Sequence, residues 1–294
     1  MKYDKNLLLN HFLVFLATFL IAGSFIASKE LTRISDPLSL TFLRFMMASI
    51  IVLPFAIMQK NSIQNIIKTM PRALVIGFFY ALFFVSFFEA LKYTSSLNTG
   101  ALFTLTPFIT AILSIFIFKN KISTKYLLAY IFGIIGTCWV IFEGNIKLLQ
   151  SFTVGKGELI FIISILAMSC YSISMKLLYK KDQMIILVSS ILISGSIWML
   201  VAMIFTKQTL ELQSLQGSSL FYMLYLVIGA TLLTVYLYQR TTIELGPRKV
   251  ISYSYLIPSL VAIISLLFYG KNIQAEIIPG ILISAIATII IQRN

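Results

Sequence analysis

The sequence predicts an all-α integral membrane protein with ten transmembrane helices, arranged as two inverted five-helix repeats. Three observations support this fold class. Hydrophobic residues make up 59% of the 294 residues and charged residues only 11%, which is more apolar surface than a soluble chain of this length buries. Ten apolar runs are long enough to cross a bilayer, and a segment of one run recurs in another at an offset of 151 residues.

The apolar runs are separated by charged residues, glycine and proline. Each holds roughly 18–24 residues, enough for a helix that rises about 1.5 Å per residue to cross about 30 Å of hydrocarbon. The first run is longer than the core of a signal peptide and lacks a small-residue cleavage site, so we interpret it as a retained helix. We expect spans at residues 9–28, 38–58, 71–92, 97–118, 124–142, 157–178, 184–206, 217–239, 249–269 and 274–292.

Lysine and arginine are distributed unequally between the two sides of this arrangement. With the N-terminus inside, the inner side carries 15 of them and the outer side 7, and Arg44 lies within a span. Because cytoplasmic loops are rich in these residues, we expect a multi-pass protein of the cytoplasmic (inner) membrane with both termini in the cytoplasm. The same rule explains the net charge of +13, so we expect the lipid bilayer and no nucleic acid as partner.

The recurring segment reads LTPFITAILS at residues 105–114 and LIPSLVAIIS at residues 256–265. The same offset relates small residues at every fourth position in the fifth and tenth spans, a spacing that allows close helix packing. These residues are Ala129, Gly133 and Thr137 in the first half and Gly280, Ser284 and Thr288 in the second. Such stripes would pack either within one protomer or between two protomers of a homodimer.

Five spans per half is an odd number, so the second half enters the membrane with the opposite orientation. We expect the first repeat to cover residues 1–145 and the second to cover residues 146–294. If exchanging the conformations of the two halves turns an inward-open protein into an outward-open one, alternating access follows from the symmetry. The pattern therefore favours a transporter.

Three stretches resemble the EamA-type family of the drug/metabolite transporter superfamily. They are TFLRF (41–45), EALKYTSSLNTGALFTLTPFITAI (89–112) and YLYQRTTIELGPRKVISYSYLIPSLVAI (236–263). The resemblance implies ten helices in two inverted repeats and carriage of small metabolites, commonly by export, with amino-acid exporters among the relatives. Many members carry a glutamate after the fourth and ninth spans, where this chain has Lys119-Asn120-Lys121 and Gly270-Lys271-Asn272.

We therefore expect a secondary transporter of a small-molecule substrate that exports amino acids or related compounds by alternating access. An importer of a specific nutrient or nucleotide-like cofactor is the alternative. The sequence contains no CxxC, HExxH, GxSxG or Walker motif, and its single histidine, His11, cannot form a metal site alone. We expect no enzyme activity, cofactor or metal, although a polytopic membrane enzyme is a less favoured reading. A channel is disfavoured because no span carries a polar pore stripe.

Arg44 and Glu89 are charged residues in the outer part of predicted spans. An ion there costs about 2.5–3.5 kcal/mol, so each needs a partner or water. We hypothesise that the two residues line or gate the outer mouth of the substrate path, with Arg44 binding a substrate carboxylate. Glu89 is also the carboxylate that would carry a proton in coupled transport. The alternative is a structural ion pair, or a contact between Glu89 and Lys92 one turn later.

Polar and aromatic residues near the repeat supply the remaining candidates for the substrate path. Pro107 and Pro258 each remove a backbone donor near mid-membrane, which predicts a helix kink that is either mobile or static. An aromatic face in the eighth span contains Tyr236 and is either a pocket wall or part of the interfacial aromatic belt. The other candidates are Ser24 and Tyr171, at equivalent positions in the two halves, together with Asn98, Thr99, Thr106 and Tyr253.

Overall fold

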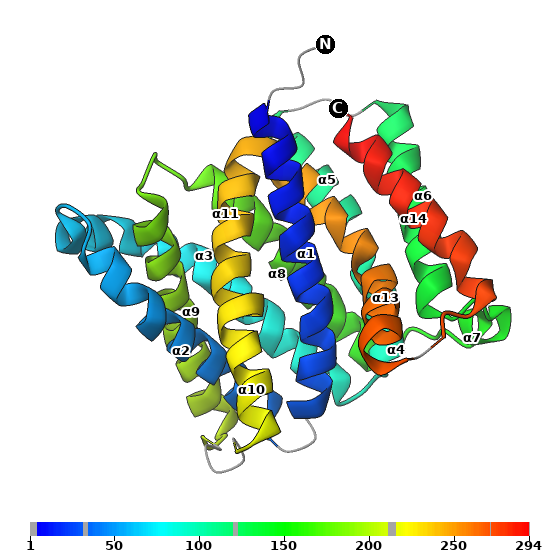
Figure 1. The fold of residues 1–294 in the computed structure, drawn as a ribbon, viewed down its shortest axis with the longest axis horizontal. Coiled ribbons are helices and arrows are strands. Elements are labelled where there is room, and N and C mark those ends of the chain that lie inside the picture. Colours follow the sequence, from blue (N-terminus) through cyan, green and yellow to red (C-terminus); the bar gives the residue numbers. More distant parts are fainter. Residues whose placement is uncertain (1–4, 32–34, 120–122, 211–215, 271, 294) are drawn as a thin grey trace.

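The computed structural model describes residues 5–31, 35–119, 123–210, 216–270 and 272–293, and every regular element in these ranges is a helix (Figure 1). Ten helical segments in this part of the chain are long and apolar enough to cross a membrane. The predicted fold class is thus confirmed. Four residues of the topology count, Lys2, Arg33, Lys121 and Lys271, lie outside the described ranges.

The first half contains α1 (Lys5–Leu31), α2 (Pro37–Ile57), α3 (Ser62–Leu91), α4 (Ser96–Phe103), α5 (Thr106–Phe118) and α6 (Thr124–Ile141). A short helix, α7 (Ile146–Gln150), leads to α8 (Lys156–Leu177) and α9 (Met184–Thr206). The eighth span consists of α10 (Ser218–Leu224), the π-helix η1 (Tyr225–Leu233) and α11 (Thr234–Leu245). The ninth and tenth spans contain α12 (Pro247–Ser252), the 3₁₀-helix η2 (Tyr253–Leu256), α13 (Ile257–Tyr269), the 3₁₀-helix η3 (Ala275–Ile277) and α14 (Ile278–Gln292).

The third and eighth spans extend furthest beyond their expected ends. The third begins at Ser62, because the helix continues through Pro71. The eighth continues beyond residue 239 to Leu245. Its polar last turns are buried by neighbouring helices, and the Gln239 side chain donates a hydrogen bond to the carbonyl oxygen of Met175 at 2.8 Å. Because hydropathy places the end of a span where polar residues begin, it misses helical turns whose polar residues are buried by neighbouring helices.

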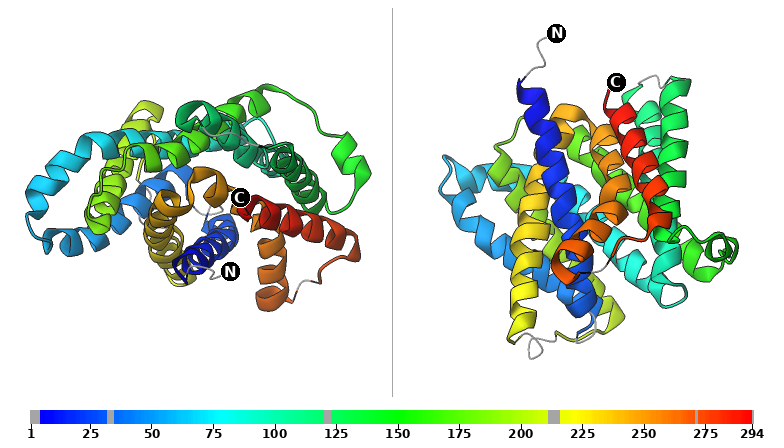
Figure 2. Two further views of the ribbon diagram at one scale, coloured as in Figure 1. Left: turned by 90° about the horizontal axis from the view of Figure 1, so that it is seen from above. Right: turned by 45° about the vertical axis from the view of Figure 1, so that its right-hand side comes forward.

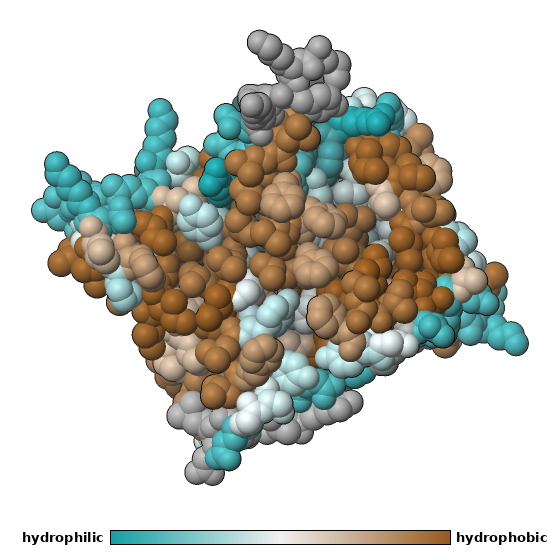
Figure 3. Space-filling view, in the orientation of Figure 1, coloured by the Kyte–Doolittle hydropathy of each residue, from teal (hydrophilic) through white to brown (hydrophobic). Residues whose placement is uncertain are grey.

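The start of α1 and the end of α14 lie on the same face of the molecule, here called the terminus face (Figure 1). The opposite face is called the far face. A hydrophobic band covers the side of the molecule between hydrophilic edges (Figure 3). Seen from above, α3, α8 and α9 form a layer behind α1 and α11 (Figure 2). This arrangement is the one expected for an even number of spans in a bilayer.

The helix contacts have the symmetry of the predicted inverted repeat. In the first half, α3 packs on α8 and α9, and in the second half the eighth span packs on α1 and α2. Likewise α5 packs on α8 as α13 packs on α1. The pairs α2–α9 and α6–α14 are their own counterparts. These main contacts are therefore preserved when the two halves are exchanged, as a pseudo-two-fold axis in the membrane plane requires.

The small-residue stripes of α6 and α14 are buried within the protomer: Gly133 and Thr137 of α6 contact Tyr255 of η2, and Gly280 and Ser284 of α14 contact α6 at Gly136. A Cβ atom on Gly280 would lie 2.7 Å from the carbonyl oxygen of Gly136, and one on Gly136 would lie 2.7 Å from the backbone nitrogen of Ser284. The two backbones are thus in direct contact, which only small residues permit. These stripes are not free to form a homodimer interface.

Candidate functional site

Arg44 lies in α2, and its side chain is buried between the two halves with 8% of its surface exposed. Its Nε donates a hydrogen bond to the hydroxyl of Thr231 at 3.2 Å, and its Nη2 donates to the carbonyl oxygen of Ala230 at 3.5 Å. The guanidinium carbon is 5.6 Å from the centroid of the Phe84 ring. In the described part of the chain, no carboxylate pairs with Arg44. A buried cation without a counter-charge is unusual for a purely structural residue.

Both acceptors of Arg44 belong to the π-helix η1. The carbonyl oxygen of Ala230 also accepts a hydrogen bond from the hydroxyl of Thr234 at 2.8 Å. π-Helical turns are rare, and they occur frequently at functional sites. The irregular turn of the eighth span therefore lies directly against the buried cation of the second span.

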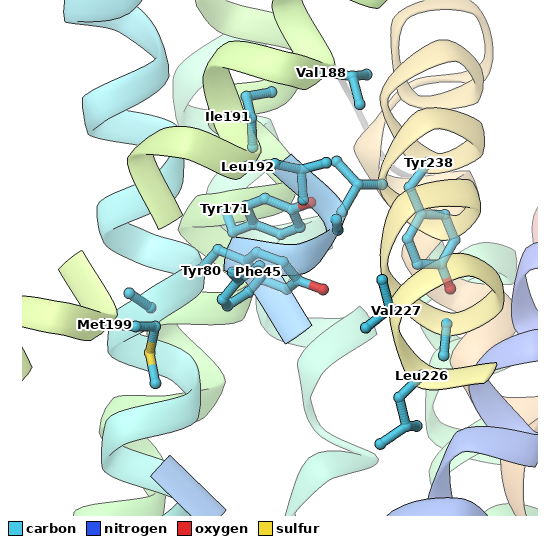
Figure 4. Packing of buried hydrophobic residues seen from close by; sticks show 14 of the residues in the cluster. Phe45, Tyr80, Tyr171, Val188, Ile191, Leu192, Met199, Leu226, Val227 and Tyr238 are labelled. Atoms are coloured by element: carbon cyan, nitrogen blue, oxygen red, sulfur yellow. The ribbon is translucent and has the colours of Figure 1, made fainter. Parts of the chain in front are cut away.

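Aromatic side chains pack beside Arg44. The rings of Tyr80 and Tyr171 are stacked, with centroids 4.3 Å apart and planes inclined by 10°. Their hydroxyls point to the same side, towards the helix that carries Tyr238 (Figure 4). Neither hydroxyl makes a hydrogen bond among the described residues, whereas the hydroxyl of Tyr238 bonds to Thr18. We call Arg44, Tyr80, Phe84, Tyr171 and Tyr238 the central cluster.

The central cluster contains residues from both halves of the protein. Arg44 lies over the Phe84 ring, the Phe84 ring is edge-on to Tyr80 with the centroids 5.3 Å apart, and Tyr171 and Tyr238 belong to the same buried cluster. Phe45 closes one side with its ring edge-on to Tyr80, the centroids being 5.0 Å apart. The cluster thus combines one cation, free hydroxyls and flat apolar walls at the junction of the two repeats.

Glu89 does not contact Arg44. Its carboxylate oxygen lies 2.6 Å from Nζ of Lys92, and its side chain is 40% exposed. The hydrogen bond to Glu89 raises the pKa of Lys92. The structure therefore shows the contact one turn later, and it does not join Arg44 and Glu89 into one gate.

Glu158, which sequence reasoning missed, is the buried carboxylate among the described residues, with 4% of its surface exposed. It lies in the first turn of α8 at the far face. Its Oε1 accepts a hydrogen bond from Nδ2 of Asn98 at 2.8 Å and another from the hydroxyl of Thr94. Its Oε2 accepts a hydrogen bond from the backbone N–H of Gly155 at 2.8 Å. We call the group of Glu158, Thr94 and Asn98 the far-end contact.

A second polar contact lies at the terminus face. Nδ1 of His11 in α1 is 3.0 Å from the hydroxyl of Tyr253 in η2. A cavity of about 260 Å³ adjoins this pair and is lined by Phe15, Tyr253, Leu256, Ala285, Thr288, Ile289 and Gln292. We call His11 and Tyr253 the terminus-end contact. In the first and sixth spans, GSFIASK (23–29) aligns with CYSISMK (170–176) at an offset of 147 residues, and the same offset places His11 and Glu158 at equivalent positions.

The two contacts therefore form a related pair at opposite ends of the molecule. The far-end contact joins the sixth span to the start of the fourth, and the terminus-end contact joins the first span to the ninth. An acidic residue in the first helical turn, three residues after Gly155, was the available signal for Glu158. That signal indicates a helix cap rather than a buried site.

Pro107 and Pro258 each lie in the first turn of a helix that follows a break in the span. Before Pro107, the backbone N–H groups of Thr104 and Leu105 donate to carbonyl oxygens three residues earlier, at 3.2 and 3.0 Å. Before Pro258, η2 forms a 3₁₀ turn. The interruption of the helix therefore precedes each proline. The proline itself lies in the first turn of the next helix, where the backbone N–H that it lacks would have had no partner in the helix.

The remaining candidates have mostly local partners. The hydroxyl of Ser24 donates to the carbonyl oxygen of Ile21 at 2.7 Å, and that of Thr99 donates to Ser96 at 3.1 Å. Thr106 is fully buried, and its hydroxyl has no hydrogen-bond partner among the described residues. Tyr236 is half-buried and packs against the main hydrophobic core. None of these four joins the central cluster.

The chain is similar to known transporters in sequence. The sequence model of the EamA-like transporter family matches residues 8–142 and 155–293. The chain is 24% identical over 208 residues to the uncharacterized transporter YyaM of Bacillus subtilis (strain 168), and the match covers 71% of this chain and 66% of that relative. The structure also matches a protein of known crystal structure with a TM-score of 0.76 at 15% sequence identity. The match covers 96% of this chain and 95% of that chain, so the two share a fold.

The two matched ranges correspond to the two structural halves, and the expected boundary between residues 145 and 146 falls in the gap between them. Each range contains five of the ten spans. Because the family model covers nearly the whole chain in two successive copies, the chain belongs to the EamA-like transporter family.

Proposed function

We propose that this protein is a secondary transporter that moves a small metabolite across the cytoplasmic membrane by alternating access, and that it exports amino acids or related compounds. The observation that carries the proposal is Arg44, a buried cation without a carboxylate partner in the described residues, at the junction of the two repeats. A substrate bound there would contact both halves and would respond to their relative movement.

The two end contacts suggest how access alternates. Opening the far face requires separation of Glu158 from Thr94 and Asn98, and opening the terminus face requires separation of His11 from Tyr253. Each contact joins the first span of one half to the fourth span of the other, so the two-fold relation gives the two events corresponding places in the cycle. In the proposed cycle one contact opens while the other stays closed. Any coupling to a proton at Glu158 would require these contacts to open first, because the three hydrogen bonds that its carboxylate accepts favour the ionised form.

Transport is tested by comparing the metabolites inside and outside cells that overexpress the protein with those of deletion cells. A solute that accumulates outside is then measured in liposomes containing the purified protein. We expect Arg44→Gln to reduce the flux at least about tenfold, because the substrate loses a charged hydrogen bond of about 1.5–3 kcal/mol. Unchanged extracellular metabolites, together with no flux of any candidate solute, would contradict the proposal.

Direction and orientation are tested separately. Uptake by inverted vesicles with none by right-side-out cells supports export, and the reverse result supports the importer of a nutrient or nucleotide-like cofactor. A reporter fused to the C-terminus is expected to be active in the cytoplasm. A homodimer remains a proposal as well, and cross-linking in the native membrane tests it.

A further inference from the structure

The guanidinium group of Arg44 has more donors than the fold has acceptors. It carries five N–H groups; one on Nε donates to Thr231 and one on Nη2 donates to Ala230. Both acceptors are neutral, so neither balances the positive charge. Among the described residues, three N–H groups and the full charge of a side chain that is 8% exposed are left for a ligand. A planar, bidentate carboxylate matches this fork of donors.

The walls beside Arg44 indicate the body of that ligand. Tyr80 and Tyr171 form a stacked pair whose hydroxyls have no partner among the described residues, and the Phe84 ring lies beneath the guanidinium. Val227 of the eighth span lies on the side towards the two tyrosines (Figure 4). Flat aromatic rings bind planar groups by offset or edge-on stacking, and free hydroxyls tolerate a polar substituent.

The charges around the central cluster argue against a zwitterion. Among the described residues, the charged side chains that are buried are Arg44 and Glu158. Glu158 is held at the far face by Thr94, Asn98 and Gly155. An α-ammonium group bound beside Arg44 would therefore have no carboxylate partner and would repel the guanidinium. A single arginine also balances one negative charge, which favours a monoanion over a phosphate dianion.

We propose that the central cluster binds an aromatic carboxylic acid as its monoanion, without an α-ammonium group. This inference rests on the transport function proposed above and narrows it from amino acids to related organic acids. Arg44 holds the carboxylate, while Tyr80, Tyr171 and Phe84 contact the ring.

Three probes with one carbon skeleton test the ligand class: 3-phenylpropanoate, L-phenylalanine and 3-phenylpropanamide. The first is an anion, the second a zwitterion and the third is neutral. Binding is measured as the rise in the thermal unfolding midpoint of the full-length protein in lipid nanodiscs, since a ligand of the folded state stabilises it by RT ln(1 + L/Kd), where L is the free ligand concentration. We expect 3-phenylpropanoate to bind at least about tenfold more tightly than the other two, which corresponds to about 1.4 kcal/mol.

The Arg44 variants assign the preference to this residue. Arg44→Gln is expected to remove the preference for the anion, and Arg44→Lys is expected to keep part of it. Arg248→Gln removes a cation near the terminus face and is expected to change nothing. The ratio between the three probes is compared within each variant, so a general loss of stability does not imitate the result.

Equal or tighter binding of L-phenylalanine by the wild-type protein would overturn the ligand class, as would stabilisation by none of the probes. Loss of the preference in Arg248→Gln, or its persistence in Arg44→Gln, would overturn the role of Arg44. These outcomes leave the transport proposal standing if another solute is carried in liposomes. Absence of any carried solute defeats the transport proposal itself.

Discussion

Glu158 and Glu89 show how tertiary contacts decide the role of a charged residue. Glu158 is one residue inside the expected sixth span, a position typical of a carboxylate at the membrane interface. Its partners Thr94 and Asn98 are 64 and 60 residues away in the chain. Glu89 lies deeper in its expected span, yet it pairs with Lys92, three residues later. Spacing along one helix predicts the second contact, and no pattern in the sequence predicts the first.

Asp182, between α8 and α9, is held by the guanidinium of Arg72 through two hydrogen bonds of 2.6 and 2.8 Å. Burial raises the pKa of this carboxyl, but the hydrogen bonds from Arg72, from the backbone N–H of Lys180 and from Thr69, together with the charge of Arg72, outweigh burial and keep the pKa of Asp182 below its ordinary value. A carboxyl with a lower pKa in the folded state stabilises the fold above its unfolded pKa, about 3.9. This stabilisation is lost as the pH falls through the folded-state pKa.

We therefore expect Asp182→Asn to destabilise the protein at pH 7 by about 1 kcal/mol, a value between those of exposed ion pairs and charged hydrogen bonds. The difference from wild type should shrink as the pH falls below about 4. Thermal unfolding midpoints in detergent from pH 7 to pH 3 measure it. Glu244→Gln, at an exposed carboxylate, is the control. A difference that stays constant down to pH 3 would refute the assignment.

At the scale of the element, helix periodicity and length locate all ten spans, but not their internal irregularities. The breaks before Pro107 and Pro258 and the π-helix in the eighth span lie inside runs that hydropathy treats as uniform. A proline indicates that a helix changes near it, without indicating on which side. The sequence has no such marker for the π-helix. The hydroxyl of Thr231 and the carbonyl oxygen of Ala230 in it accept hydrogen bonds from Arg44, which lies on another helix.

The contact between α6 and α14 predicts the effect of adding one methyl group. Gly280→Ala places a Cβ atom against the backbone oxygen of Gly136, and backbone cannot move aside as a flexible side chain can. We expect a loss of about 1–3 kcal/mol, the usual cost of overpacking, measured as a lower thermal unfolding midpoint. Gly100→Ala is the matched control, because its new Cβ atom would meet only the Ile141 side chain at 3.8 Å. Equal midpoints for the two variants would contradict the close approach.

At the scale of the whole molecule, the two halves are joined at the far face and at the terminus face by contacts that the repeat symmetry relates. Lys156 lies 4.0 Å above the Tyr93 ring beside the far-end contact, and Phe15 and Leu256 line the cavity at the terminus face. Alternating access requires each end to open once in every cycle. Fixing either end should therefore stop transport.

This expectation is tested with cysteine pairs in a protein lacking Cys138 and Cys170. One pair is Tyr93→Cys with Lys156→Cys, and the other is Phe15→Cys with Leu256→Cys. A thiol cross-linker about 8 Å long is expected to reduce liposome flux at least about tenfold in either double variant, since a closed end blocks the cycle. The single-cysteine variants treated with the same reagent should keep their flux. Full flux after complete cross-linking of either pair would exclude an opening at that end.

The sequence by itself determined that the protein lies in a lipid bilayer, how many spans it has and that its two halves are related. Composition, run length and an internal repeat are properties of the chain that need no knowledge of its neighbours. Tertiary structure alone decided which charges are buried together. It separated Arg44 from Glu89, surrounded Arg44 with Thr231, Phe84 and Tyr80, and enclosed Glu158. The physical reason is that burial and pairing depend on helices brought together from both halves, and the pattern along one helix does not record them.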